Sequence, residues 1–146
     1  MTPVAYLASI EQQGPSDFLV RFFDVPEAIS QGDTLQAARL NAYDALQAAL
    51  EGYLEMDRAF PARSEIASDA ARAGVSLWDA AVDPKLAARA RVVAEMKVQG
   101  VSNVGLAKLM GRDEKAVRLI LGGRGASLEK TLEALKALGV RPALAA

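Results

Sequence analysis

The N-terminal part of the chain alternates apolar and polar residues with the period of two that is typical of half-buried strands. In Val4–Glu11 this alternation is regular, and Phe18–Phe23 is largely apolar and aromatic after the turn-forming run Gln13–Asp17. The two segments predict a β-hairpin. A third short strand is expected at Ala28–Gln31, which a proline precedes and a glycine follows.

The period then changes to that of a helix. Asp33 or Thr34 supplies an N-cap oxygen for a helix that continues to about Met56. An antiparallel sheet with this helix on one face is the simplest arrangement that buries both. Apolar residues at helical spacing form the stripe that would face such a sheet: Leu35, Ala38, Ala42, Leu46, Ala49, Leu50 and Tyr53.

The next segment, 60–74, has no strong period and is interpreted as a connection. Val75–Val82 is apolar, carries the single tryptophan of the chain and predicts one more strand. Residues 1–83 are therefore expected to form a β-β-β-α-β domain. The dipeptide Asp83-Pro84 starts a helix, because Asp caps a helix and Pro is favoured at its first position.

Residues 84–146 predict an all-α domain in which each helix is delimited by a capping residue or a glycine. The expected helices are Pro84–Gln99, Ser102–Met110, a third from the cap Asp113 to near Leu121, and a fourth from the cap Ser127 to Gly139. The inner face of the fourth helix is expected to carry Leu128, Leu132, Leu135 and Leu138.

The amino-acid composition excludes several kinds of catalytic and metal site. The chain has 146 residues without histidine or cysteine, which excludes catalytic triads, cysteine nucleophiles, His/Cys zinc sites and disulfides. With 51% hydrophobic and 24% charged residues it has a globular composition. The N-terminus lacks the pattern of a signal peptide, and no apolar run reaches the ~18 residues of a membrane span, so we expect a cytoplasmic protein without membrane contact.

The formal net charge of -1 hides a strong segregation of charge along the chain. Residues 1–84 carry five arginines against thirteen acidic residues, a charge of -8, and residues 85–146 carry twelve Lys or Arg against five acids, a charge of +7. Such asymmetry suggests two modules with partners of opposite sign, and nucleic acid is the candidate partner of the basic half. The alternative is that the segregation of charge is accidental or serves only to dock the two halves on each other.

The segment Leu106–Ile120 has the spacing of a helix-turn-helix. Ala107 is small where two crossing helices approach, Gly111 permits a positive φ in the turn, and Val117 with Ile120 anchors the second helix. These anchors leave Glu114, Lys115 and Arg118 on the outer surface, which enters the major groove in this motif. The alternative is a helical bundle whose basic residues only solvate it.

Arg118 is the candidate for a bidentate contact to guanine, and Lys115 for a base or a phosphate. Glu114 either accepts from a cytosine amino group or favours the positive end of the helix dipole. Residues at helix starts and turns around this surface are expected to contact the DNA backbone: Ser102, Asn103, Lys108, Arg112, Arg124, Ser127 and Lys130.

The first domain offers weaker chemistry. Its carboxylates are the right ligands for a hard cation, but a cap or a solvated helix face explains them better, so no metal, cofactor or catalytic residue is predicted. Its aromatic residues are expected in the core rather than as a platform for bases. The acids considered are Asp24, Asp33, Asp44, Glu51 and Glu55, and the aromatic residues are Tyr6, Phe18, Phe22 and Phe23.

Taken together, the chain resembles the HicB-type antitoxin family of bacterial toxin-antitoxin systems. Phe23 and Glu27 replace the Pro and Gly that are usual at those family positions. The resemblance is carried by Tyr6–Ala8, Phe18–Pro26, Gln31–Thr34 with Asn41-Ala42, Pro61–Ser64, and the C-terminal segments Lys85–Ala87, Gly100–Asn103, Asp113–Arg118 and Ala137–Gly139.

The resemblance implies an α+β fold in two parts: a partial ribonuclease-H-like domain without catalytic carboxylates, and a C-terminal helix-turn-helix domain. The first would sequester a small basic HicA-type toxin that cleaves mRNA, and the second would bind operator double-stranded DNA and repress its own operon. An acidic surface suits a basic partner. Candidates for toxin contact are Asp24, Glu27, Asp33, Glu51 and Glu55.

We therefore expect a non-enzymatic antitoxin and autorepressor. A homodimer or tetramer is expected, because one recognition helix covers only a few base pairs and a two-fold pair places two helices about 34 Å apart on the DNA. Two other classes stay open: a stand-alone regulator whose first domain senses a ligand or oligomerises, and a metal-dependent nuclease that uses clustered carboxylates.

Overall fold

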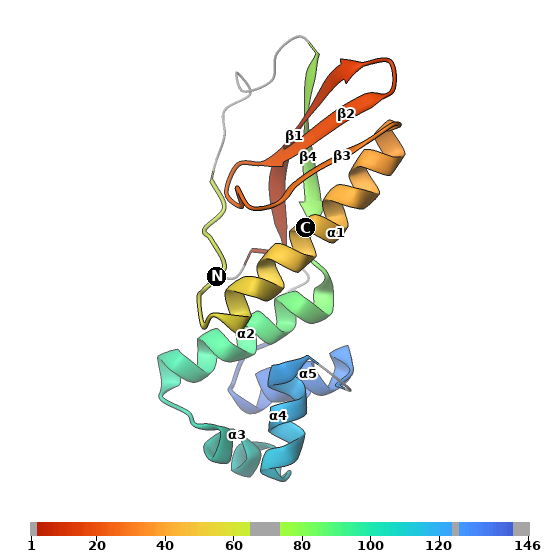
Figure 1. The fold of residues 1–146 in the computed structure, drawn as a ribbon. Helices are drawn as coiled ribbons and strands as arrows, with labels where there is room; N and C mark the ends of the chain where they lie inside the picture. Colours follow the sequence, from red (N-terminus) through yellow and green to blue (C-terminus); the bar gives the residue numbers. More distant parts are fainter. Residues whose placement is uncertain (1–2, 65–73, 124–125, 142–146) are drawn as a thin grey trace. The chain divides into compact units, whose positions relative to one another are not determined.

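The computed structural model describes residues 3–64, 74–123 and 126–141. It separates into two compact units, one spanning Pro3–Val82 and the other beginning at Asp83 (Figure 1). Among the residues described, the first unit contains a sheet and one helix, and the second contains four helices. The architecture is thus mixed α+β, as the sequence predicts.

The sheet of the first unit is antiparallel, with strand order β3-β2-β1-β4. The strands are β1 (Ala5–Gly14), β2 (Asp17–Phe22), β3 (Ile29–Gly32) and β4 (Val75–Ala81). The predicted hairpin and the other two strands are confirmed. The hairpin turn is tighter than predicted, because Gly14 pairs with Asp17 and only Pro15 and Ser16 lie between the strands.

Helix α1 (Leu35–Glu55) runs across one face of this sheet (Figure 1). The strand register places Tyr6, Ala8 and Ile10 opposite Ala80, Phe22 and Val20, and all six are buried. The predicted stripe of α1 is confirmed at Ala38, Ala42, Leu46, Leu50 and Tyr53, whereas Leu35 and Ala49 are half-buried.

Thr34, not Asp33, caps α1. The Thr34 hydroxyl oxygen accepts a 3.0 Å hydrogen bond from the N–H of Ala37, and Asp33 is exposed. Directly before them, β3 approaches the helix so closely that a Cβ on Gly32 would lie 2.4 Å from the backbone nitrogen of Ala38. Glycine at this position therefore lets the strand and the helix pack together.

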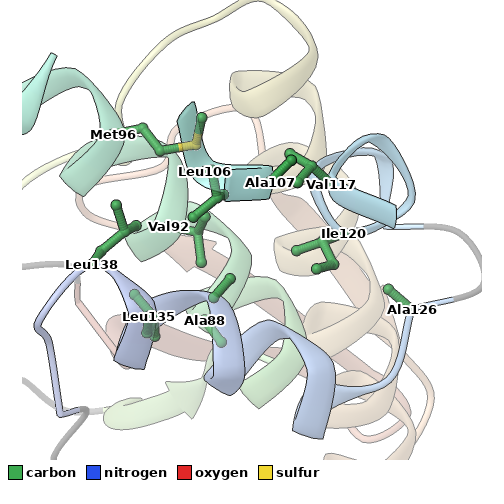
Figure 2. Close-up of a cluster of buried hydrophobic side chains, with 11 residues drawn as sticks. Ala88, Val92, Met96, Leu106, Ala107, Val117, Ile120, Ala126, Leu135 and Leu138 are labelled. Atoms are coloured by element: carbon green, nitrogen blue, oxygen red, sulfur yellow. The ribbon is translucent and has the colours of Figure 1, made fainter. Parts of the chain in front are cut away.

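The second unit consists of α2 (Pro84–Gln99), α3 (Asn103–Met110), α4 (Glu114–Gly122) and α5 (Leu128–Ala137). The predicted N-caps are confirmed at Asp83, Asp113 and Ser127, whereas Ser102, predicted as the first residue of its helix, is the N-cap of α3. All four helices contribute to one core, in which Val92, Leu106, Val117, Ile120 and Leu135 point toward one another (Figure 2). No helix within the described ranges combines the length and apolar composition needed to cross a bilayer.

Two predicted core positions are wrong. Leu128 is 38% exposed, because Ala126 and Thr131 fill the inner side at the start of α5 and Thr131 donates a 3.0 Å hydrogen bond to the carbonyl of Ser127. Phe23 is 41% exposed, because β2 ends at its buried neighbour Phe22 and Phe23 lies just beyond the strand.

Candidate nucleic-acid interface and acidic surface

The candidate nucleic-acid interface is built on α3, α4 and the turn between them. Gly111 ends α3 in the left-handed region, with φ 66°, and Asp113 caps α4 by accepting a 2.9 Å hydrogen bond from the N–H of Ala116. Ala107, Val117 and Ile120 are buried in the core shown in Figure 2. All the predicted anchors therefore face inward, and they fix which side of α4 faces outward.

The outer side of α4 carries Glu114, Lys115 and Arg118, all exposed as the sequence predicts. Nη1 of Arg118 lies 3.6 Å from Oε1 of Glu114, one helical turn away. The pair is solvent-exposed and therefore weak. Glu114 thus attracts the side chain of Arg118 toward the preceding turn of α4 but does not fix its position.

The flanking candidates on and beside α3 and α5 carry hydroxyls and cations. The hydroxyl oxygens of Ser102 and Ser127 accept from the N–H groups of Gly105 and Lys130, at 3.0 and 3.2 Å. Each hydroxyl keeps its own proton to donate outward. Lys108 and Lys130 are exposed, Asn103 is half-buried at the first turn of α3, and Arg124 lies outside the described residues.

Arg112 has a partner that sequence reasoning missed. Nη2 of Arg112, in the turn between α3 and α4, lies 2.9 Å from Oε2 of Glu133 on α5, and both side chains are nearly half exposed. No short-range pattern marks this pair, because the two residues are far apart in the chain. The ion pair ties the turn to α5.

Arg89 was also missed. It is 6% exposed on α2, and its guanidinium lies beside Gly123, the residue that follows α4. The sequence does contain a signal for it. The inward stripe of α2 runs through Leu86, Val92 and Met96, and Arg89 interrupts it at helical spacing.

In the first unit, two of the predicted acidic candidates are engaged within the molecule. The carboxylate of Asp24 accepts hydrogen bonds from both the N–H (2.8 Å) and the hydroxyl of Ser64. The carboxylate of Glu27 accepts a 2.7 Å bond from the hydroxyl of Tyr53, which lowers the pKa of Glu27. Both acids thus help to hold the fold of this unit.

The start of the predicted connection is fastened to the sheet. The hydroxyl of Tyr6 donates to the carbonyl of Pro61 at 2.7 Å, and burial followed by the charge of Asp24 raises the pKa of Tyr6. Arg63 donates to the carbonyl of Ala5 at 2.9 Å and lies 2.5 Å from the carboxylate of Asp79. The remainder of this connection, 65–73, lies outside the described residues.

The other three acidic candidates do not form one site. Asp33 precedes α1, and Glu51 lies about 24 Å further along that helix. Glu51 and Glu55 share the outward side of α1 with an apolar residue that was not predicted there, Leu40, which is 69% exposed. We call this line the α1 outer stripe; its members, spaced three or four residues apart, are Leu40, Asp44, Ala48, Glu51 and Glu55.

Within the described part of the chain, no three acidic side chains are grouped so as to hold a metal ion. Of the candidates of the first unit, Asp24 and Glu27 are thus engaged in internal hydrogen bonds, Glu51 and Glu55 lie on the α1 outer stripe, and Asp33 is exposed just before α1. The described candidates of the second unit lie on α3, α4 and α5 and in the turns before them, and those that carry a positive charge are Lys108, Arg112, Lys115, Arg118 and Lys130.

The chain is similar in sequence to known proteins. Residues 5–78 match the family described as HicB-like antitoxin of bacterial toxin-antitoxin system. The chain is 32% identical over 121 residues to Antitoxin HicB 2 of Photorhabdus laumondii, covering 82% of this chain and 81% of that protein. It is 36% identical over 64 residues to Antitoxin HicB 1 of the same organism, covering 44% and 41%.

A solved structure, the crystal structure of the Burkholderia pseudomallei antitoxin HicB, aligns with a TM-score of 0.49 and 20% identity, covering 56% of this chain and 63% of that one. The family match and the similarity to Antitoxin HicB 2 carry the assignment. The chain therefore belongs to the HicB-like antitoxin family of bacterial toxin-antitoxin systems.

Proposed function

We propose that the first unit neutralises a small basic mRNA-cleaving toxin of the HicA type and that the second represses the chain's own operon by binding operator DNA. Membership of the antitoxin family supports the toxin half. One observation carries the DNA half: α4 buries Val117 and Ile120 while Lys115 and Arg118 remain exposed. In this account the chain acts by binding alone, in the cytoplasm.

On this proposal, α4 enters the major groove with the N-terminal half that carries Glu114, Lys115 and Arg118. The planar guanidinium of Arg118 suits the two acceptors of a guanine edge. On DNA binding this guanidinium either separates from the carboxylate of Glu114 or is oriented by it. Lys115 reaches a base or a phosphate. Base readout is thereby concentrated on one exposed strip of a nine-residue helix.

The DNA backbone would be held around that strip. Lys108, Arg112 and Lys130 supply charge, and the capping serines donate the protons that their caps leave unused. Asn103 and Arg124 complete the proposed phosphate contacts. Since one such helix reads only a few base pairs, we propose a homodimer or tetramer that presents two copies of α4 to successive turns of the groove.

The toxin would meet the acidic face of the first unit. Thirteen acids against five arginines in residues 1–84 give this part of the chain the sign that attracts a protein with an RNA-binding surface. We place the contact on Glu51 and Glu55 of the α1 outer stripe, because exposed Leu40 adds an apolar element to the same line. Asp24 and Glu27 would stabilise the fold of the unit, and Asp33 would lie at the edge of the toxin contact.

A titration of the full chain against labelled duplexes tests the DNA half. One duplex carries the sequence upstream of the chain's own reading frame, and the other is the same sequence scrambled. We expect a clear preference for the first duplex at physiological salt. Equal affinity for both would contradict operator recognition, and a lack of binding to either would contradict the DNA half altogether.

A further inference from the structure

We infer that Arg89 is a positioning residue for the DNA-binding surface: from α2 it holds the C-terminal end of α4 and thereby sets the direction in which Lys115 and Arg118 project. The inference rests on the proposed function of α4. Arg89 itself is buried, so it is not a candidate for DNA contact.

The burial of Arg89 calls for a specific role. Among the described residues, Arg89 and Thr131 are the only buried polar or charged side chains apart from the tyrosines. A guanidinium stays charged at physiological pH, and burying it is costly unless polar groups receive it. The hydroxyl of Thr131 donates to the carbonyl of Ser127, the N-cap of its own helix, whereas the guanidinium of Arg89 lies beside Gly123, the residue after α4.

The contact with Gly123 is close. A Cβ built on Gly123 would lie 1.5 Å from Nη1 of Arg89 and 2.8 Å from Cζ, so the guanidinium occupies the space of a side chain at position 123. Gly123 also has a φ of 72°, which only glycine adopts readily. Two independent constraints therefore keep this position free of a side chain.

The guanidinium lies at the end of α4 where the helix dipole is negative and the last carbonyls lack partners within the helix. A helix of nine residues has little stability of its own. Val117 and Ile120 fix one side of α4 in the core, and Arg89 adds a second point at its C-terminal end. Two separated anchors define the axis of the helix.

The direction of that axis matters for selectivity. A bidentate contact tolerates displacements of only about 0.5 Å, whereas contacts to phosphates by flexible lysines tolerate more. Loss of the Arg89 anchor should thus damage base readout before it damages general DNA binding. A residue that only stabilised the fold would reduce both in proportion to the unfolded fraction.

Arg89→Met tests the inference in the full chain, at a temperature where circular dichroism shows wild type and variant to be fully folded. We expect operator affinity to fall about tenfold or more, the loss of one good base contact. Affinity for the scrambled duplex should change less than about twofold. The matched control is Arg91→Met on the same helix, where Arg91 is half-buried and pairs with Glu95 at 3.2 Å; it should leave both affinities unchanged.

A double-mutant cycle distinguishes positioning from stability. Combined with Arg118→Ala, Arg89→Met should cost little more, because the contact that it positions is already lost. Combined with Lys108→Ala, it should cost its full amount. Additive losses with Arg118→Ala, or equal losses on operator and scrambled DNA, would overturn the inference.

If Arg89→Met does not fold, Arg89→Lys replaces it, since lysine keeps the charge and most of the length but lacks the planar fork. We expect Arg89→Lys to lose operator selectivity, and wild-type selectivity would overturn the inference. If the proposed function itself is wrong, the result differs: Arg118→Ala alone would leave operator selectivity intact. Selectivity that is lost in Arg118→Ala and retained in Arg89→Met overturns only the role of Arg89.

Discussion

The hydroxyl of Tyr53 donates a 2.7 Å hydrogen bond to the carboxylate of Glu27, which joins the end of α1 to the loop before β3. This bond, followed by a backbone hydrogen bond within Glu27 and the charge of Arg58, lowers the pKa of Glu27 below its ordinary value of 4.5. The guanidinium of Arg58 lies over the Tyr53 ring, 4.6 Å from its centroid. Three side chains thus close the end of the helix against the loop.

The bond makes the stability of the first unit depend on pH. A carboxyl whose pKa is lowered by folding contributes stability that is complete above its unfolded value of about 4.5 and is lost as the pH falls through the lowered value. Tyr53→Phe removes the main cause, so we expect a smaller loss of stability between pH 7 and pH 3 than in wild type. Urea unfolding at the two pH values measures it, and equal losses would contradict the assignment.

Arg118 and Lys108 should fail in different ways. We expect Arg118→Ala to lose about 1–3 kcal/mol of operator affinity and to relax selectivity at one base pair. Lys108→Ala should weaken operator and scrambled duplexes alike and reduce the salt slope by about one. Anisotropy titrations over a salt series measure both quantities, with Lys85→Ala at the start of α2 as the charge control. Equal losses on both duplexes for Arg118→Ala would contradict base readout.

Glu133 should restrain the DNA affinity of the chain through its ion pair with Arg112. Glu133→Gln releases Arg112 for phosphate, so we expect tighter binding to both duplexes and less than about 1 kcal/mol of lost stability, because the pair is exposed. Glu129→Gln makes the same change of charge on an exposed residue of α5. If the two variants tighten binding equally, the effect is one of net charge and the specific role of the pair is refuted.

The α1 outer stripe gives the toxin half its sharpest mutational test. We expect Glu55→Lys to slow toxin association several-fold at low salt, with the difference shrinking at about 1 M salt, where the Debye length is about 3 Å. Asp17→Lys, at the start of β2, makes the same change of charge away from α1. Stopped-flow association rates compare them, and equal slowing would place the contact elsewhere on the acidic unit.

The sequence was most informative where structure depends on near neighbours. The caps at Ser102 and Asp113 accept from N–H groups three residues onward, and the left-handed Gly111 ends α3, so a short window of sequence contains both signals. The burial of Val117 and Ile120 follows from helical spacing in the same way. The elements and the outward face of α4 were predictable for this reason.

Contacts between distant segments were not predictable. The partners of Asp24 and Arg112 lie 40 and 21 residues away, and only the packed fold brings them together. The sequence therefore presented Asp24 as a free acid on an interaction face, whereas the structure commits it to Ser64. Leu40 was missed although the signal is local. An apolar residue on the polar side of α1 only breaks the helical pattern, and nothing else in the nearby sequence marks it as exposed.

Purification of the tagged chain from its native operon tests the central claim, neutralisation of a toxin, most directly. The account predicts that a small basic protein co-purifies in stoichiometric amount, that it cleaves RNA once the two are separated, and that adding the chain back suppresses the cleavage. A partner that cleaves RNA equally well in the presence of the chain, or purification without any such partner, would contradict the claim.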